Sequence, residues 1–293
     1  MLGVSDRSWL VEMLCNITAD SAECATGPQY SIYFGFGHHI RLYDRSGVFR
    51  VSLAGVALGS YLLKSIDAHE LGGKLLDIGT GSGAFALLLR SMGAADVIGT
   101  DISEAAIGLA RENEVLNFDA ERIRFHSGDL FAGLPRGERY DTVIFNPPGW
   151  RTPSDHLLDE LRRIGDECEI APEAMFYGDQ VVLRFLQHLP SRLHPKGRAL
   201  MGLNSLVGIQ DVLSNYRSGY APADPPLRFR LLERHAFPLL FYTRGWQRAE
   251  PFLREEFKDW QDRYGAAYTV DGAGRIYWSY EVVECALGLK PAA

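Results

Sequence analysis

Short apolar segments typical of strands alternate with segments of helical spacing from about residue 74 onward. The segments 74–78 and 96–101 are predicted strands, and each is followed by a predicted helix, 84–92 and 104–116. Strands connected through helices run parallel and receive helices on both faces, so this order predicts an α/β fold with a mostly parallel sheet. Ligands of such sheets bind at the carboxyl ends of the strands.

The predicted sheet continues through the second half of the chain. Further strands are predicted at 123–125, 140–145, 199–203, 227–234 and 276–285, with helices at 178–193 and 246–264. Residues 1–70 differ in character from this part. They contain two segments of helical spacing, 8–16 and 52–66, and an aromatic segment between them, so we expect a separate, mostly helical amino-terminal unit.

Composition limits the class, the partners and the location that the chain can have. The chain of 293 residues is 46% hydrophobic and 23% charged, as in ordinary globular proteins, and its net charge of −7 argues against a nucleic acid as partner. Its four cysteines are widely spaced and form no zinc-binding pattern, so no metal is expected and a cytoplasmic location is predicted. No apolar segment approaches the roughly 20 residues that span a bilayer, so no membrane is expected as a partner. The oligomeric state stays open.

A stiffened loop follows the predicted strand 140–145. Its sequence is Asn146-Pro147-Pro148-Gly149, and two consecutive prolines cannot continue a strand ladder. Pro147 restricts Asn146 to an extended conformation, so a short amide side chain leaves the carboxyl edge of the sheet. The Asn146 side-chain carbonyl and a fixed backbone carbonyl then form a pair of acceptors. This pair predicts a site for a nitrogen nucleophile, an amine or an amide, with Asn146 and Pro147 as catalytic candidates.

A glycine-rich turn follows the first predicted strand. In Asp77-Ile-Gly79-Thr80-Gly81-Ser-Gly83, three alternate glycines let the backbone turn tightly and approach a ligand. The spacing is G-x-G-x-G, whereas the dinucleotide fingerprint is G-x-G-x-x-G. Asp77 would also repel a pyrophosphate, while it suits an ammonium or another cationic group. The turn therefore predicts a cofactor site that is not a dinucleotide site.

Acidic residues also follow the next two predicted strands. Asp101, with Ile102 beside it, can accept hydrogen bonds from both hydroxyls of a ribose. Gly128-Asp129 follows the third strand, where the carboxylate can accept from an adenine amino group and Leu130 can cover the ring. The candidate cofactor-binding residues are Asp77, Gly79, Thr80, Gly81, Gly83, Asp101, Ile102, Gly128, Asp129, Leu130 and Asn146.

Together these segments resemble the class I S-adenosylmethionine-dependent methyltransferases. The residues 75–84, Asp101, Gly128-Asp129 and 146–148 follow the order and spacing of that family, over about residues 74 to 205. The resemblance implies a Rossmann-like sheet with an antiparallel last strand and S-adenosylmethionine as cofactor. It also divides the chain into an amino-terminal lid or substrate domain at 1–70 and a catalytic domain at 71–293, with a late helical insertion at about 237–275.

Within that family, the sequence is most similar to the release-factor glutamine methyltransferases. Their motif continues to a segment like 171–179 of this chain, which adds Tyr177 as a catalytic candidate. The departure is at the fourth loop position, where Gly149 replaces the aromatic residue that stacks on a planar amide or base. Such a platform contributes about 1–3 kcal/mol for a base. Trp150 follows directly, but a neighbour in sequence need not point the same way.

Three functions are compatible with these residues. The leading hypothesis, motivated by Gly149, is N-methylation of a small amine or amide, with a small-molecule partner in secondary metabolism. The alternative is an S-adenosylmethionine cyclase, an azetidine-2-carboxylate synthase, in which the cofactor's own amine attacks Cγ and methylthioadenosine leaves. The second alternative is methylation of protein glutamine or RNA. Four aromatic residues are either core or a cation–π surround for the sulfonium: Tyr30, Tyr33, Phe34 and Phe36.

Overall fold

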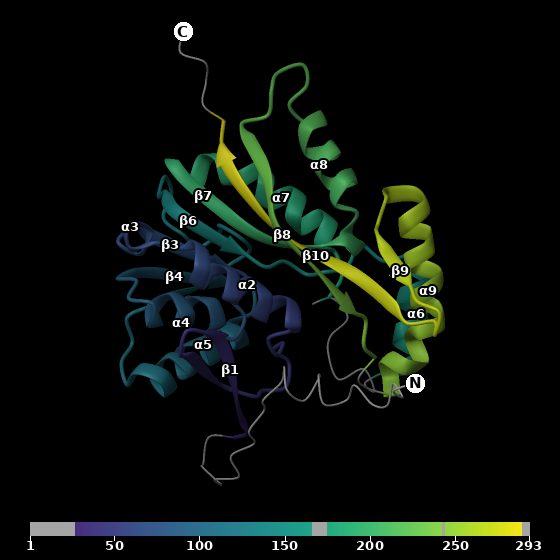
Figure 1. Ribbon diagram of the computed structural model, residues 1–293, viewed down its shortest axis with the longest axis horizontal. Coiled ribbons are helices and arrows are strands. Elements are labelled where there is room, and N and C mark those ends of the chain that lie inside the picture. Colours follow the sequence, from purple (N-terminus) through teal and green to yellow (C-terminus); the bar gives the residue numbers. More distant parts are fainter. Residues whose placement is uncertain (1–26, 166–174, 242–243, 289–293) are drawn as a thin grey trace, which may run out of the picture.

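A single twisted sheet forms the centre of the computed structural model, which describes residues 27–165, 175–241 and 244–288 (Figure 1). The strand order is β5-β4-β3-β6-β7-β10-β8, and β9 pairs with β10. The strands are β3 Lys74–Ile78, β4 Asp96–Asp101, β5 Arg124–Ser127, β6 Tyr140–Phe145, β7 Leu193–Asn204, β8 Leu227–Pro238, β9 Tyr268–Val270 and β10 Ile276–Leu287. β3 to β7 are parallel to one another, whereas β10 is antiparallel to both β7 and β8. The predicted Rossmann-like sheet with an antiparallel last strand is confirmed.

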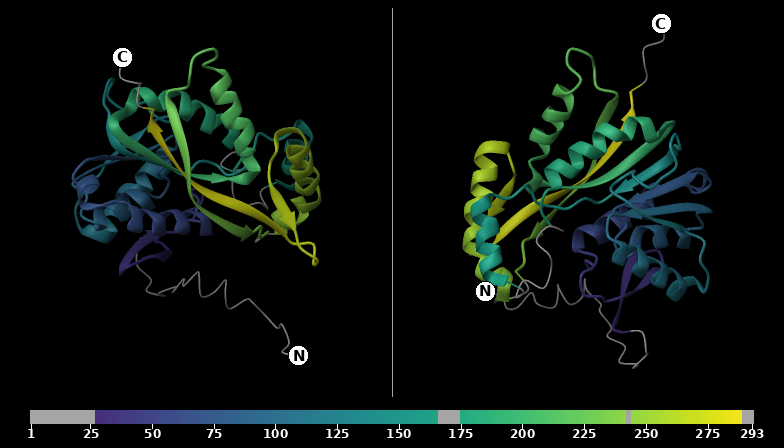
Figure 2. Two further views of the ribbon diagram at one scale, coloured as in Figure 1. Left: turned by 45° about the horizontal axis from the view of Figure 1, so that its top comes forward. Right: turned by 180° about the vertical axis from the view of Figure 1, so that it is seen from behind.

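Helices cover both faces of the sheet (Figure 2). On one face, α2 Leu53–Ser65, α4 Ala84–Ser91 and α5 Glu104–Phe118 bury a large apolar core, and on the other, α7 Gly178–Arg192 and α8 Ile209–Ser218 bury a second. Local signals define the helix starts: the side chains of Ser52 and Ser103 accept hydrogen bonds from Gly55 N and Ala106 N.

The described part of the amino-terminal segment differs from the mostly helical unit that the sequence predicts. Gln29–Gly35 and His38–Tyr43 form a β-hairpin, β1 and β2, which contacts α2, α4 and α5. Alternating burial along β1 explains the difference, because one face of the strand lies in the core and the other faces outward. The predicted helix at 8–16 lies outside the described residues. The proposed division of the chain at residue 70 stays a prediction.

A third apolar cluster lies beside one end of the long strands β8 and β10 (Figure 1). It joins α6 Asp155–Ile164, which the sequence does not predict, to α9 Arg244–Tyr264, whose core the sequence predicts at 246–264. Trp150 is buried at its centre, with its ring edge-on to the rings of Phe176 and Trp246. None of the described helices is both long and apolar enough to cross a membrane.

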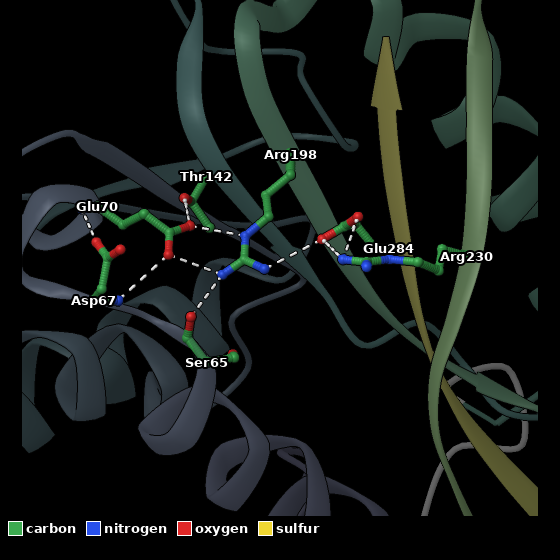
Figure 3. Close-up of polar contacts among 7 residues, drawn as sticks. All are labelled: Ser65, Asp67, Glu70, Thr142, Arg198, Arg230 and Glu284. Atoms are coloured by element: carbon green, nitrogen blue, oxygen red, sulfur yellow. Dashed lines mark hydrogen bonds and ion pairs between the residues drawn. The ribbon is translucent and has the colours of Figure 1, made fainter. Parts of the chain in front are cut away.

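An arginine on β7 connects segments that are far apart in sequence (Figure 3). Arg198 donates two hydrogen bonds of 2.8 Å to the carboxylate of Glu70, one of 2.8 Å to the Ser65 carbonyl and one of 3.2 Å to Glu284. Arg230 completes the set with an ion pair of 3.0 Å to Glu284. This group links the end of α2 and the short helix α3 Ala68–Leu71 to β7, β8 and β10.

Candidate cofactor and acceptor site

The glycine-rich turn connects β3 to α4 at the carboxyl edge of the sheet. Gly79 and Gly81 have φ values of 67° and 54°, in the left-handed region that favours glycine, and a β-carbon at either would have no neighbour within 4 Å. These two residues therefore leave open space for a ligand along the backbone. Gly83 has another reason to be glycine, because a β-carbon there would lie 3.0 Å from the β-carbon of Ala110 on α5.

Asp77 is fully buried beneath this turn. Its Oδ2 accepts hydrogen bonds from Thr80 Oγ1 at 2.6 Å and from Ala86 N at 3.2 Å. Its Oδ1 has no hydrogen-bond partner among the described residues. Burial is the main reason why the pKa of Asp77 is raised to about 7. A buried carboxylate oxygen without a donor fits a cationic ligand such as the ammonium of S-adenosylmethionine.

Asp101 fixes the turn from the end of β4. Its Oδ2 accepts a hydrogen bond of 2.9 Å from Gly81 N, and its Oδ1 accepts one of 2.9 Å from Ser103 N. The carboxylate therefore lies at the turn, where the sequence places a ribose. Ile102 is 72% exposed although it is a large apolar residue, so its side chain is available to cover part of a bound ring.

The turn after β5 is shaped by glycine as well. A β-carbon at Gly128 would overlap the Ala132 carbonyl, so no other residue fits there. Asp129 forms an ion pair with Arg184 of α7, and both side chains are about half exposed. Leu130 adopts a left-handed φ of 53° and is buried, and Thr100 Oγ1 donates to its carbonyl at 3.2 Å. The Asp129 carboxylate therefore lies at the same sheet edge as Asp101, as the sequence predicts.

Asn146 lies at the end of β6, between β3 and β7. Its Oδ1 accepts a hydrogen bond of 2.7 Å from the Tyr280 hydroxyl of β10. Burial raises the pKa of Tyr280, so the hydroxyl keeps its proton at neutral pH. Gly202 of β7 provides the space, because a β-carbon there would overlap the Tyr280 hydroxyl. A carbonyl oxygen has two acceptor positions, so Asn146 retains one for a ligand.

The loop after Asn146 leads through Gly149 to Trp150 in the third cluster. A β-carbon at Gly149 would lie 2.8 Å from Asn204 Nδ2 at the end of β7, so the Asn204 amide borders the loop where a larger residue would project. Trp150 does not replace the missing aromatic platform, since its ring is buried among Phe176, Trp246 and Phe257.

Tyr177 lies next to the same loop through its backbone. It precedes α7 with a left-handed φ of 67°, and the following residue, Gly178, donates a hydrogen bond of 2.8 Å to the Trp150 carbonyl. The partly buried side chain of Tyr177 packs against the third cluster. The structure thus brings Tyr177 to the loop, and its catalytic role stays a prediction.

The aromatic residues of the hairpin separate into two groups. Tyr30 is buried, and its hydroxyl accepts a hydrogen bond of 3.3 Å from Val51 N and lies near Ser82 of the glycine turn. Phe34 is buried against α2, whereas Tyr33 and Phe36 are 56% and 82% exposed. The four aromatic residues therefore do not together form a cation–π surround.

Sequence reasoning missed three residues of this site: Gly202, Asn204 and Tyr280. They lie on β7 and β10, at least 56 positions after Asn146 in the sequence. Locally, the sequence marks only Gly202 and Asn204, which interrupt the apolar pattern at the end of a predicted strand. Strand pairing brings Tyr280 opposite Asn204, and this pairing cannot be read from spacing.

The parallel sheet with its antiparallel last strand, the glycine turn after β3 and the acidic residues after β4 and β5 form a Rossmann-like methyltransferase fold, whose cofactor is S-adenosylmethionine. Residues 69–202 match the family model described as a methyltransferase domain. In fold, the chain is similar to SMU.776, a protein assigned to the methyltransferases and solved with SAH. That similarity has a TM-score of 0.51 at 12% identity and covers 89% of this chain and 57% of the other.

Curated relatives align with about half of this chain. A protein of Methanocaldococcus jannaschii, provisionally named a protein N5-glutamine methyltransferase, is 29% identical over 143 residues, which are 49% of this chain and 68% of the relative. The release factor glutamine methyltransferase of Rhodopirellula baltica is 30% identical and covers 50% of each chain. The ribosomal protein uL3 glutamine methyltransferase of Bradyrhizobium diazoefficiens is 32% identical, over 54% of this chain and 53% of its own. The last two matches thus span about half of each relative.

These relatives correct the expected partner. They are named for acting on glutamine in proteins, so the expectation of a small-molecule partner, drawn from Gly149, is wrong. The structure gives another reason for the small residue at position 149, because a β-carbon there would lie 2.8 Å from the Asn204 side-chain nitrogen. Gly149 therefore does not by itself indicate a smaller substrate. The cyclase alternative finds no support among these relatives.

Proposed function

We propose that this chain transfers a methyl group from S-adenosylmethionine to the side-chain amide nitrogen of glutamine in a protein substrate. One observation carries the proposal: Asn146 directly follows β6, which pairs with β3, and β3 leads directly into the glycine turn. This arrangement would place an amide acceptor beside the cofactor at one sheet edge. The relatives named for glutamine methylation support this substrate class.

The chemistry of a carboxamide explains why two acceptors are useful here. Its nitrogen is a weak nucleophile, because the lone pair is delocalised into the carbonyl, so orientation must supply much of the rate. Its two N–H groups also need acceptors once they leave water. The free acceptor position of Asn146 Oδ1 and the Pro147 carbonyl are the two candidates. Tyr280 holds the Asn146 amide in place through its hydrogen bond of 2.7 Å.

The residues around the glycine turn would hold the cofactor. Asp77 offers its unpaired Oδ1 to the ammonium, Gly79 and Gly81 leave space along the backbone, and Asp101 lies where a ribose would donate its hydrogen bonds. When bound, S-adenosylmethionine supplies a methyl group on a positively charged sulfur. The contribution of the chain is then to place the amide nitrogen in line with that methyl group.

The experiment uses the full chain and two protein substrates. We would incubate it with S-adenosylmethionine carrying a labelled methyl group and, separately, with an unmethylated bacterial release factor and with ribosomal protein uL3. We expect label in one of them, and tryptic peptides heavier by one methylene at a glutamine. Asn146→Ala should lower kcat by roughly 100-fold or more with little change in cofactor affinity, since it removes an orienting group.

Two results would contradict the proposal. Label on a residue other than glutamine would exclude this substrate class. Formation of methylthioadenosine from S-adenosylmethionine alone would instead indicate alkyl transfer within the cofactor. Isothermal titration with S-adenosylhomocysteine serves as the control, because it shows that an inactive preparation still binds the cofactor product.

A further inference from the structure

We propose that the side-chain nitrogen of Asn204 donates a hydrogen bond to the carbonyl oxygen of the acceptor carboxamide. This inference rests on the proposed function and adds a specificity-determining residue outside the Asn-Pro-Pro segment. Asn204 is the last residue of β7, the strand next to β6, and is 7% exposed. Three observations carry it: the orientation of the Asn204 amide, its lack of a partner and its place beside Gly149.

The orientation of the Asn204 amide is fixed by the backbone. Leu206 N donates a hydrogen bond of 2.9 Å to Asn204 Oδ1, which assigns the oxygen and leaves Nδ2 on the other branch. That nitrogen would lie 2.8 Å from a β-carbon at Gly149. The donor nitrogen therefore lies beside the last residue of the Asn-Pro-Pro-Gly loop.

Asn204 Nδ2 has no acceptor of its own within residues 27–165, 175–241 and 244–288. Four enclosed side-chain polar atoms of the described residues also lack a partner: Ser65 Oγ, Asp77 Oδ1, Glu114 Oε2 and Tyr216 Oη. Asn204 Nδ2 is not one of these enclosed atoms, so it reaches accessible space beside the loop. A largely buried amide with one open N–H group gains a hydrogen bond when a ligand brings an acceptor.

A carboxamide matches this arrangement of acceptors and donor. It has two N–H groups for Asn146 and Pro147 and one carbonyl oxygen for Asn204. An amine such as a lysine side chain has no carbonyl, so it would leave Asn204 unpaired. Gly149 makes the contact possible, because any larger residue there would meet the Asn204 amide. The pair of Gly149 and Asn204 thus recognises the amide by hydrogen bonding instead of by stacking.

The first test is Asn204→Asp, which keeps an oxygen for Leu206 N and the shape of the side chain but removes the donor. With the release factor as probe, we expect kcat/KM to fall about 3- to 10-fold, the effect of one neutral hydrogen bond. The cofactor dissociation constant and the thermal midpoint should not change. Asn215→Asp, on the exposed surface of α8, is the control for an added carboxylate. Equal activity of Asn204→Asp and the control would overturn the assignment.

The second test is a double-mutant cycle between positions 149 and 204. Gly149 is not among the glycines with positive φ, so alanine fits its backbone and acts only through its β-carbon. We expect Gly149→Ala to lower kcat/KM in the natural chain and to have no further effect in Asn204→Ala. Strictly additive losses would show that the two positions act separately and would contradict the proposal.

A spectroscopic test keeps this inference separate from the proposed function. The side-chain ¹⁵N–¹H signal of Asn204, assigned by its loss in Asn204→Asp, should shift when N-acetylglutamine methylamide is added to the protein loaded with S-adenosylhomocysteine. N-acetylnorleucine methylamide, which has no side-chain amide, should leave it unmoved. If neither protein substrate is methylated but the signal shifts, the proposed activity fails and the Asn204 assignment holds. If glutamine is methylated but the signal stays unmoved, the activity holds and the Asn204 assignment fails.

Discussion

Asp77, which we propose as a partner of the cofactor ammonium, destabilises the ligand-free protein at neutral pH. Its pKa is raised from 3.8 to about 7, first by burial and further by the charge of Asp101, while Thr80 and Ala86 lower it. Between these pH values the native state keeps a proton that the unfolded chain has lost. The free energy of unfolding of the ligand-free protein therefore decreases, through this group, as pH rises from about 4 to 7.

We expect the affinity for S-adenosylmethionine to increase between pH 6 and pH 8, because a cationic ligand favours ionised Asp77. The change should approach tenfold per pH unit below the pKa of about 7. Isothermal titration in buffers of different ionisation enthalpy would measure both affinity and proton release. Asp77→Asn is the control: it should bind more weakly, show only the titration of the cofactor itself and unfold at a higher temperature at pH 8. Identical pH profiles for both proteins would exclude this role.

We regard Tyr280 as a positioning residue, because in the proposed function it would act on the acceptor only through Asn146. Tyr280→Phe removes the hydroxyl that donates to Asn146 Oδ1 at 2.7 Å and leaves the ring in its buried place. We expect kcat to fall about 3- to 10-fold with little change in cofactor affinity. Gly202→Ala should cause a larger loss, because its β-carbon would overlap the hydroxyl. In the Tyr280→Phe background, Gly202→Ala should lower kcat by a smaller factor. An equal loss of kcat in both backgrounds would contradict this role.

At the scale of elements, the acceptor loop, residues 146–149, ends at the third apolar cluster, which packs α6 against α9. Only two residues separate Trp150 from Pro147, and Trp150 is 4% exposed in contact with Phe176, Trp246 and Phe257. The loop is therefore held at one end by the sheet and at the other by a helical lobe. Movement of that lobe would be transmitted directly to the residues that we propose for acceptor binding.

Trp150→Ala should lower the free energy of unfolding by about 3–5 kcal/mol, the usual range for removing a buried large aromatic residue. It should also lower kcat at saturating cofactor, because the loop loses its anchor. Trp150→Phe keeps a ring and should recover most of both quantities. Urea denaturation and steady-state assays would measure the two effects. A destabilised Trp150→Ala enzyme with unchanged kcat would show that the lobe does not position the loop.

The elements of the sheet could be predicted from sequence because their signals are local. The strands β3, β4 and β6 have their predicted bounds, since each is a short apolar segment ended by a turn. The helix α6 escapes prediction because its segment is polar and short, and it becomes stable only by packing on α9. The hairpin at Gln29–Tyr43 could not be predicted, because its aromatic residues are also compatible with a lid. Of the acceptor site, the loop could be predicted and its partners on β7 and β10 could not.

At the scale of the whole molecule, Arg198 holds three separate regions together. Its side chain is 21% exposed, and it bonds to Glu70, Ser65 and Glu284 at the amino-terminal edge of the central strands, away from the site (Figure 3). Such a group stabilises the fold more than an exposed ion pair, because its partners would otherwise remain unpaired in a partly buried place.

Arg198→Gln should lower the free energy of unfolding by about 1–3 kcal/mol. Arg230→Gln is the matched control: it also pairs with Glu284, but its side chain is 67% exposed, so we expect a change within about 0.5 kcal/mol. Urea denaturation midpoints at low and high salt would compare the stabilities of the two variants. The cofactor affinity should be unchanged in both variants. Equal losses for the two variants would mean that Glu284 alone accounts for the effect.

The position of β10 between β7 and β8 has a consequence for synthesis on the ribosome. β8 leaves the ribosome before β10, yet among the described strands it pairs only with β10. Until that strand emerges, β7 and β8 both have open edges that invite pairing with other chains. Tyr280 arrives with the same strand, so the acceptor loop is also unsupported until then. A nascent chain that already contains the glycine turn and Asn146 therefore still lacks the hydroxyl that holds Asn146, and its vulnerable interval ends when β10 is inserted.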